Sequence, residues 1–180
     1  FPAPYPLQAV AARGGVPPRV LDAGASTGGF TEVLLARGAA HVFALDVGHD
    51  QLAPRVAQDP RVTNWEGVHI NTVTVDQFDP RPELIVIDVS FISLTKILAT
   101  VKALTPLHGT VIALIKPQFE VGREAIGHGV VRDARLHQSA VEGVVAFARA
   151  LGFRVSEPIP SPILGGDGNK EFLLKLERIR

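Results

Sequence analysis

The feature that most constrains the fold of this chain is a regular alternation of two kinds of segment. Short runs rich in β-branched residues alternate with segments of helical periodicity. The alternation is typical of parallel strands joined by right-handed crossover helices, so we expect an α/β fold with a mostly parallel, doubly wound sheet. The expected strands are 19–22, 41–46, 83–89, 110–115, 153–155 and 171–176, and the expected helices are 30–37, 50–57, 94–104 and 133–151.

Several element ends carry their usual signals. Gly38 and Gly152 each follow a helical segment, where glycine commonly ends a helix, and Asp133 can cap the long helix that begins after it. The last strand, 171–176, follows the turn-rich residues 165–169 with no helix before it. We therefore expect this strand to be antiparallel and to lie at or near the edge of the sheet.

The composition limits the classes of protein. With 180 residues, 46% of them hydrophobic, the chain predicts one domain over 18–180, preceded by an irregular, proline-rich segment 1–17. The lack of cysteine excludes disulfides and thiolate metal sites and agrees with a cytoplasmic location. The scattered histidines predict no metal site, and no apolar run approaches the roughly 20 residues that cross a membrane. The net charge of zero offers no basic excess for RNA, and the sequence sets no oligomeric state.

A glycine-rich turn joins the first strand to the first helix. The residues Ala23-Gly24-Ala25-Ser26-Thr27-Gly28-Gly29 stand between the strand end Asp22 and the helical residue Phe30. Glycines here let the backbone approach a ligand at the carboxyl edge of the sheet, although a tight turn without a ligand is the alternative. A dinucleotide fingerprint needs a second glycine where Ser26 stands, so a pyrophosphate is a poor fit.

Two acidic residues favour a different cofactor. Asp22, directly before the turn, suits a cationic ligand, because a carboxylate would repel a pyrophosphate. S-adenosylmethionine carries a sulfonium and an ammonium. Asp46, at the end of the second strand, is placed to accept hydrogen bonds from an adenosine ribose, although a solvated strand-end aspartate is the alternative.

Three further ionisable residues stand at expected strand ends. Asp88 ends one apolar strand, Lys116 ends the next, and Glu171 begins the last strand. A single lysine closing an apolar strand is often only a snorkelling side chain. The three together, at the edge where a substrate would meet the cofactor, instead indicate a catalytic cluster.

The chain from about Val20 to Leu176 resembles the TlyA (hemolysin A) family within the FtsJ-like ribose methyltransferases. The segments that carry the resemblance are LDAGASTGGFTEVLLARGAAHVFALDVG, VIDVSFISL, LIKPQFEVGRE, GVVRD and GNKEFLL. The resemblance implies a class I methyltransferase fold, S-adenosylmethionine as methyl donor, and ribose 2′-hydroxyls of ribosomal RNA or a ribosomal subunit as target. It also implies a Lys-Asp-Lys-Glu tetrad, whose last three positions fall on Asp88, Lys116 and Glu171.

The tetrad has a physical reason. A ribose hydroxyl is a weak nucleophile at neutral pH, so a base or cation beside it must ease removal of its proton. Lys116 could accept the proton or stabilise the alkoxide, with Asp88 and Glu171 holding its ammonium. Most of the remaining acceleration should come from placing the hydroxyl beside the methyl group.

The sequence departs from the family pattern in places. The first tetrad lysine belongs before the first strand, yet the earliest lysine here is Lys96. Arg13 could supply a cation at the first tetrad position, although an ordinary surface arginine is the alternative. The family's N-terminal RNA-binding module has no counterpart in these residues. The first tetrad lysine is lost, replaced, or missing together with an N-terminal segment. His69 stands where relatives often have asparagine. The expected cofactor-binding residues are Asp22, Gly24, Ala25, Ser26, Gly28, Phe30, Asp46, Val47, His69 and Asp88.

For RNA binding, three residues are candidates. Phe91 could stack a base, with core packing as its alternative. Arg123 and Arg132 flank a glycine-rich loop that could contact phosphates or simply be solvated.

Two competing functions are a nucleotide-binding or hemolysin-like factor without catalysis, and a nucleotide-dependent dehydrogenase. The glycine spacing disfavours the dehydrogenase, and the lack of an amphipathic basic helix disfavours a membrane-active factor.

Overall fold

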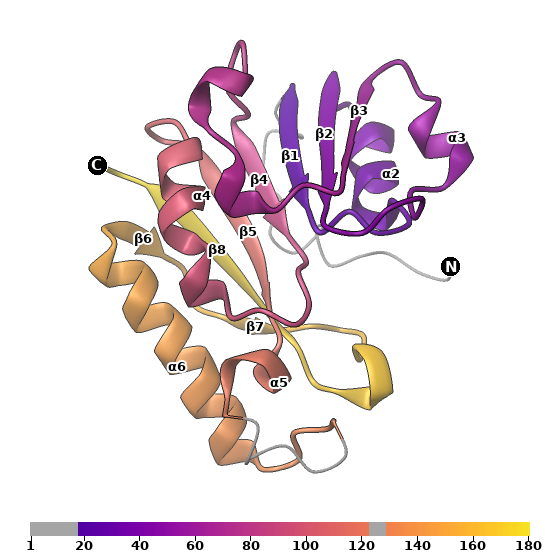
Figure 1. Ribbon diagram of the computed structural model, residues 1–180. Helices are drawn as coiled ribbons and strands as arrows, with labels where there is room; N and C mark the ends of the chain where they lie inside the picture. The colour runs from indigo at the N-terminus through magenta and orange to yellow at the C-terminus, as the bar shows by residue number, and fades with distance from the viewer. Residues whose placement is uncertain (1–17, 123–128) are drawn as a thin grey trace.

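Eight strands form one sheet at the centre of the computed structural model, which describes residues 18–122 and 129–180 (Figure 1). The strand order is β3-β2-β1-β4-β5-β8-β6, and β7 also pairs with β8. The strands are β1 (Arg19–Ala23), β2 (His41–Asp46), β3 (Val62–Glu66), β4 (Leu84–Ile87), β5 (Thr110–Ile115), β6 (Phe153–Val155), β7 (Ile159–Pro160) and β8 (Phe172–Arg178).

The direction of the strands matches the expected fold class. Strands β1 to β5 pair in parallel, whereas β8 is antiparallel to β5, β6 and β7. The prediction of a mostly parallel sheet with an antiparallel last strand is confirmed. The last strand lies one position inside the edge, because β6 and β7 both pair along its outer side.

Helices cover the two faces of the sheet. The α-helices are α2 (Gly29–Ala36), α3 (Pro54–Ala57), α4 (Leu98–Leu104), α5 (Pro117–Glu120) and α6 (Ala134–Ala150), and the 3-10 helices are η1 (Ile70–Thr72), η2 (Val75–Gln77), η3 (Leu94–Lys96) and η5 (Gly166–Gly168). In β1, Leu21 joins the core cluster under α4 and α6, whereas its neighbour Val20 joins the cluster under α2. This alternation at full burial is the pattern of a strand covered on both faces.

Three differences from the sequence expectation have local causes. Strand β3 was not expected, because it is an edge strand whose Thr63 and Asn64 interrupt an apolar pattern. The expected helix 50–57 is reduced to α3, since Pro54 occupies its first position and favours a helix start there. The expected helix 94–104 is divided into η3 and α4 at Ile97.

The helix ends follow their signals. Gly38 and Gly152 both adopt positive φ, at 96° and 89°, directly after the C-cap residues of α2 and α6. Asp133 caps α6, because its Oδ1 accepts a hydrogen bond of 2.8 Å from the Arg135 N–H.

Candidate active site

The strand register brings the three expected tetrad residues to one edge of the sheet. Ile87 of β4 pairs with Ala113 of β5, so the residues that follow both strands emerge side by side. Strand β8 runs in the opposite direction, and its first residue, Phe172, pairs with Ile115. Glu171, directly before Phe172, therefore lies beside Lys116, directly after Ile115.

Lys116 forms the centre of this cluster. Its Nζ lies 2.7 Å from Asp88 Oδ1 and donates a hydrogen bond of 3.0 Å to Ser90 Oγ. The Lys116 side chain is only 13% exposed, and that of Asp88 is 19% exposed. An ion pair with so little solvent contact holds the ammonium in a defined position.

Glu171 is buried on the other side of the cluster. Burial raises the pKa of its carboxyl above the usual 4.5, the Lys116 ammonium lowers it, and the Asp88 charge raises it again. A Cβ at Gly165 would lie 2.0 Å from Glu171 Oε1, so any larger residue there would require the Glu171 carboxylate to move. The charges of Lys116 and Asp88 therefore both influence the carboxyl of Glu171.

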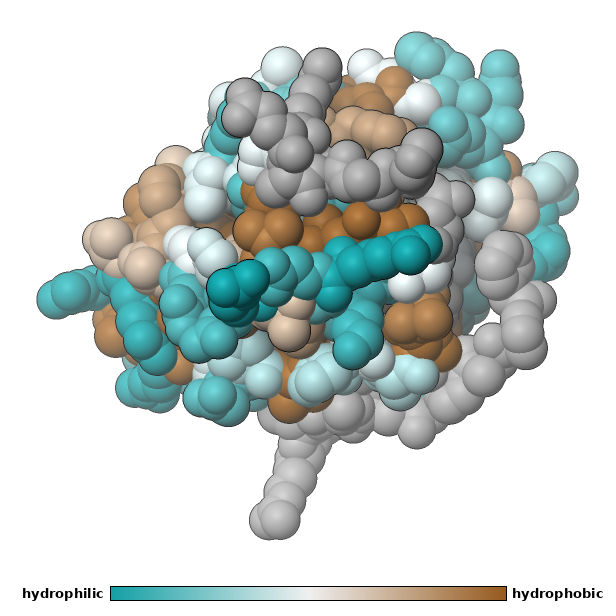
Figure 2. Space-filling view, turned by 90° about the horizontal axis from the view of Figure 1, so that it is seen from below, coloured by the Kyte–Doolittle hydropathy of each residue, from teal (hydrophilic) through white to brown (hydrophobic). Residues whose placement is uncertain are grey.

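The cluster opens into a cavity of about 960 Å³ that also contains the glycine-rich turn. Its walls come from the turn and α2, from the ends of β4 and β5, and from the segment between β7 and β8. Figure 2 shows the molecule from this side, with hydrophobic residues gathered in the middle of the face among hydrophilic ones. The residues that line the cavity include Gly24, Ala25, Ser26, Phe30, Asp88, Ser90, Leu114, Lys116, Leu164 and Glu171.

The turn itself requires its glycines. Gly24 adopts a φ of +88° and Gly28 a φ of +99°, both in the left-handed region. The N–H groups of Gly24 and Ala25 donate to the carbonyl oxygen of Leu45, at 2.8 and 3.0 Å, which fixes the turn to the end of β2. The turn therefore presents a backbone surface to the cavity.

Asp46 lies beside the turn and is oriented by it. Its Oδ2 accepts a hydrogen bond of 2.8 Å from the Ser26 N–H, and its Oδ1 accepts one of 2.8 Å from the Gly48 N–H. Each carboxylate oxygen can accept a second hydrogen bond, so the pair can still receive the two hydroxyls of a ribose. The neighbouring Val47 is exposed and could cover an adenine from one side.

Asp22 does not lie where we expected it. Its side chain is fully buried between β1 and α2, and its Oδ2 accepts a hydrogen bond of 2.7 Å from Thr31 Oγ1. Burial raises its pKa to about 7. The expectation of direct contact with a cationic ligand is corrected, because a group without exposed surface can act only by holding the turn against the helix.

Two other expected cofactor contacts have structural roles of their own. Phe30 borders the cavity, but most of its ring is buried in the core with α2. The Nδ1 atom of His69 accepts a hydrogen bond of 3.1 Å from the Asn71 N–H and so caps η1. Contact of either residue with a cofactor stays a prediction.

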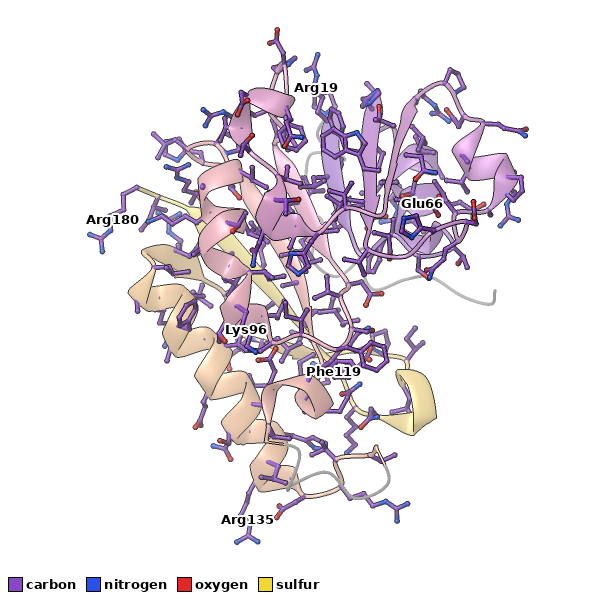
Figure 3. All side chains as sticks on the ribbon, in the orientation of Figure 1. Arg19, Glu66, Lys96, Phe119, Arg135 and Arg180 are labelled. Atoms are coloured by element: carbon purple, nitrogen blue, oxygen red, sulfur yellow. The ribbon has the colours of Figure 1, made fainter. Side chains whose placement is uncertain are left out.

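Phe91 is the most unusual residue near the cluster. It is 91% exposed, adopts a positive φ of 64°, and its ring centroid lies 5.1 Å from that of Phe119. Figure 3 shows Phe119 on α5, at the same edge of the sheet. The alternative of core packing for Phe91 is therefore wrong.

The arginines are less informative. Arg132 is exposed just before α6, as a phosphate-binding residue would need to be. Arg123 and Arg13 lie outside the described residues.

Sequence reasoning missed Glu120. Its carboxylate accepts hydrogen bonds from the segment that follows β4. The residue stands in the KPQFE motif, but no spacing rule pairs that motif with the segment after β4.

Within the described ranges, no cluster of His, Asp and Glu has the geometry to hold a metal ion. In the same ranges, none of the helices combines the length and the apolar character needed to span a bilayer.

Comparison with known proteins identifies first the fold and then the family. The sheet superposes on the N-methyltransferase NodS from Bradyrhizobium japonicum with a TM-score of 0.66, over 97% of this chain and 93% of that one, at 15% identity. At this identity the likeness shows a class I methyltransferase fold. The profile of the FtsJ-like methyltransferase family matches residues 7–178, and the chain belongs to this family.

Similar proteins extend the match across most of the chain. The 16S/23S rRNA (cytidine-2′-O)-methyltransferase TlyA of Mycobacterium tuberculosis (strain H37Rv) is 45% identical over 88% of this chain and 59% of its own length. Hemolysin A of Brachyspira hyodysenteriae is 43% identical over 85% and 65%. The crystal structure of a candidate hemolysin from Lactococcus lactis has a TM-score of 0.90 at 44% identity, over 96% and 83%. The chain thus spans less than two thirds of the length of the first two relatives.

Proposed function

We propose that the protein transfers a methyl group from S-adenosylmethionine to a ribose 2′-hydroxyl of ribosomal RNA. The observation that carries the proposal is the Lys116–Asp88 ion pair, which lies in the same cavity as the glycine-rich turn. The similar TlyA protein of M. tuberculosis carries this activity in its name, and the family match agrees with it.

Several residues fit the cofactor. The turn Gly24–Gly28 offers a surface without large side chains, and the free lone pairs of Asp46 suit the two hydroxyls of a ribose. Val47 would lie against the adenine, and His69 and Phe30 would line its surroundings. When bound, S-adenosylmethionine supplies an electrophilic methyl group. Asp22, buried behind the turn, would keep the turn in shape without touching it.

Lys116 takes one of two roles: as the neutral amine it would receive the proton of the ribose hydroxyl, and as the ammonium it would stabilise the negative charge of the ribose oxygen. Its ammonium has three donors, one of which donates a hydrogen bond to Ser90 Oγ, while its charge pairs with Asp88. A further donor of the ammonium would bind a ribose oxygen. Asp88 would hold the ammonium through the ion pair, and the charge of Glu171 would help to compensate it in a site with little solvent, where electrostatic stabilisation is strong.

Phe91 and Arg132 would contact the RNA. The exposed ring of Phe91, supported by Phe119, offers a face on which a base can stack. Such stacking would place the ribose of that nucleotide beside Lys116, at the end of the neighbouring strand β5. Arg132, and Arg123 beyond the described residues, would bind phosphates.

The test is methyl transfer to ribosomal RNA with isotope-labelled cofactor, followed by nuclease digestion of the product. We expect the label in a 2′-O-methylnucleoside; label on a base would contradict the proposal. Calorimetric titration with S-adenosylmethionine and NAD addresses the dehydrogenase alternative, and preference for NAD would defeat the cofactor assignment. A binding or hemolysin-like factor would bind the cofactor without methylating RNA.

A further inference from the structure

Two segments at the carboxyl edge of the sheet contact each other at three successive places. They are 88–94, after β4, and 116–120, after β5. The first contact is the ion pair described above, and the second is the ring contact between Phe91 and Phe119. The third contact is formed by Glu120, a residue to which the proposed chemistry assigns no role.

Glu120 binds the far end of the first segment with both carboxylate oxygens. Its Oε2 accepts a hydrogen bond of 2.6 Å from Ser93 Oγ, and its Oε1 accepts one of 2.8 Å from the Leu94 N–H. Hydrogen bonds to a carboxylate are short and strong. Leu94 is itself buried in the main core cluster, so the segment is fixed to the sheet at this end.

The part of the segment between these fixed points needs such support. Phe91 is held at a positive φ, which a residue with a bulky side chain rarely adopts, and its ring is almost entirely in solvent. Burial therefore cannot be what maintains its conformation. The segment is held on one side by Lys116 and on the other by Glu120.

We propose that Glu120 is a positioning residue that keeps the Phe91 ring at the height and angle at which a stacked nucleoside presents its 2′-hydroxyl to Lys116. The inference rests on the proposed function for its substrate. Glu120 itself touches neither the reacting atoms nor the cofactor turn. Its removal should affect turnover more than binding of the cofactor.

The experiment compares Glu120→Ala and Glu120→Gln with the unmodified protein. The matched control is Glu142→Ala, which removes an exposed carboxylate on α6 that accepts a hydrogen bond only from Gln138 of the same helix among the contacts described. For each protein, kcat and KM for ribosomal RNA and the Kd for S-adenosylmethionine are measured. A nuclear Overhauser effect between the labelled rings of Phe91 and Phe119 reports their contact without any reaction.

We expect Glu120→Ala to lose the ring contact and to lower kcat by at least about 10-fold, while the Kd for S-adenosylmethionine stays within about 2-fold. Glu120→Gln should retain part of the ring contact and part of kcat, because its amide oxygen can still accept a hydrogen bond from the Leu94 N–H. Glu142→Ala should behave as the unmodified protein. A residue that only stabilises the fold would lower the melting temperature without this selective change in kcat.

A folded Glu120→Ala variant with an unchanged ring contact and unchanged kcat would overturn the inference. If this variant does not fold, Glu120→Gln decides, since the inference requires it to weaken the ring contact and kcat together. Absence of methyl transfer by the unmodified protein would refute the proposed function instead. The ring contact would then test the role of Glu120 on its own.

Discussion

Gly24 packs directly against the backbone of Asp88, so the glycine-rich turn and the segment after β4 are in contact. A Cβ at Gly24 would lie 2.2 Å from the Asp88 carbonyl oxygen, and the φ of Gly24 is +88°. The same glycine therefore shapes the turn and sets its distance from Asp88, one of the three residues proposed to be catalytic.

Gly24→Ala should destabilise the protein and weaken cofactor binding. The left-handed conformation alone costs about 1–2 kcal/mol for a residue with a Cβ, and the contact with Asp88 requires a further shift of the backbone. Gly143→Ala on α6 is the control, because a Cβ there meets nothing within 4 Å and should stabilise by about 0.5–1 kcal/mol. Urea unfolding measures the free energy of unfolding of both variants, and calorimetric titration measures the affinity for S-adenosylmethionine. Equal stability of Gly24→Ala and the unmodified protein would contradict this account of the turn.

Asp22→Asn should change how stability depends on pH. The buried carboxyl keeps its proton up to a pKa of about 7 in the folded state but loses it near 3.8 when unfolded. Its contribution to stability is therefore fully present below the unfolded pKa and is lost as the pH rises through about 7. Relative to Asp22→Asn, the unmodified protein should lose up to about 4 kcal/mol of unfolding free energy between pH 4 and pH 7. Parallel pH profiles of the two proteins would show that burial does not perturb Asp22.

Glu171→Gln should alter the acid side of the pH–rate profile. Burial raises the pKa of this carboxyl, and the charge of the Lys116 ammonium favours its ionised form. As the pH falls through this raised pKa, activity should decline at a higher pH than for an ordinary glutamate. The variant should be slower and should lack this acid limb. An unchanged acid limb in Glu171→Gln would assign the titration to another group.

Phe91→Ala should separate stability from activity. The ring is 91% exposed, so its removal should change the unfolding free energy by no more than about 0.5 kcal/mol, whereas Phe153→Ala in the core should cost about 3–5 kcal/mol. Methyl transfer should fall in Phe91→Ala, because a stacked base contributes about 1–3 kcal/mol of binding. Thermal unfolding and RNA titration measure the two effects. Unchanged RNA affinity and turnover would exclude Phe91 as a stacking surface.

The sequence predicted the parts of the fold that depend on local pattern. The strand ends Asp46, Asp88 and Lys116 follow from apolar runs that stop at a charged residue, and the glycine-rich turn follows from its composition. The edge strand β3 did not follow, because the polar side chains of an edge strand weaken the apolar signal.

The contacts of the site depend on three-dimensional packing and were less predictable. Asp22 has the position in sequence of a ligand-binding acid, but its side chain turns toward Thr31. The contact of Glu120 with Leu94 joins residues 26 positions apart, which no periodicity reveals. Exposure of Phe91 could likewise not be distinguished from core packing by its residue type alone.

The most direct test of the central claim is the rate at which the Lys116→Ala variant of the full-length protein 2′-O-methylates ribosomal RNA. Lys96→Ala is the control, because Lys96 is exposed on η3 and lines no part of the cavity. The account predicts that Lys116→Ala lowers kcat by about 10²–10⁴-fold with little change in the Kd for S-adenosylmethionine, and that Lys96→Ala is unaffected. A Lys116→Ala protein that methylates RNA at the unmodified rate would contradict it.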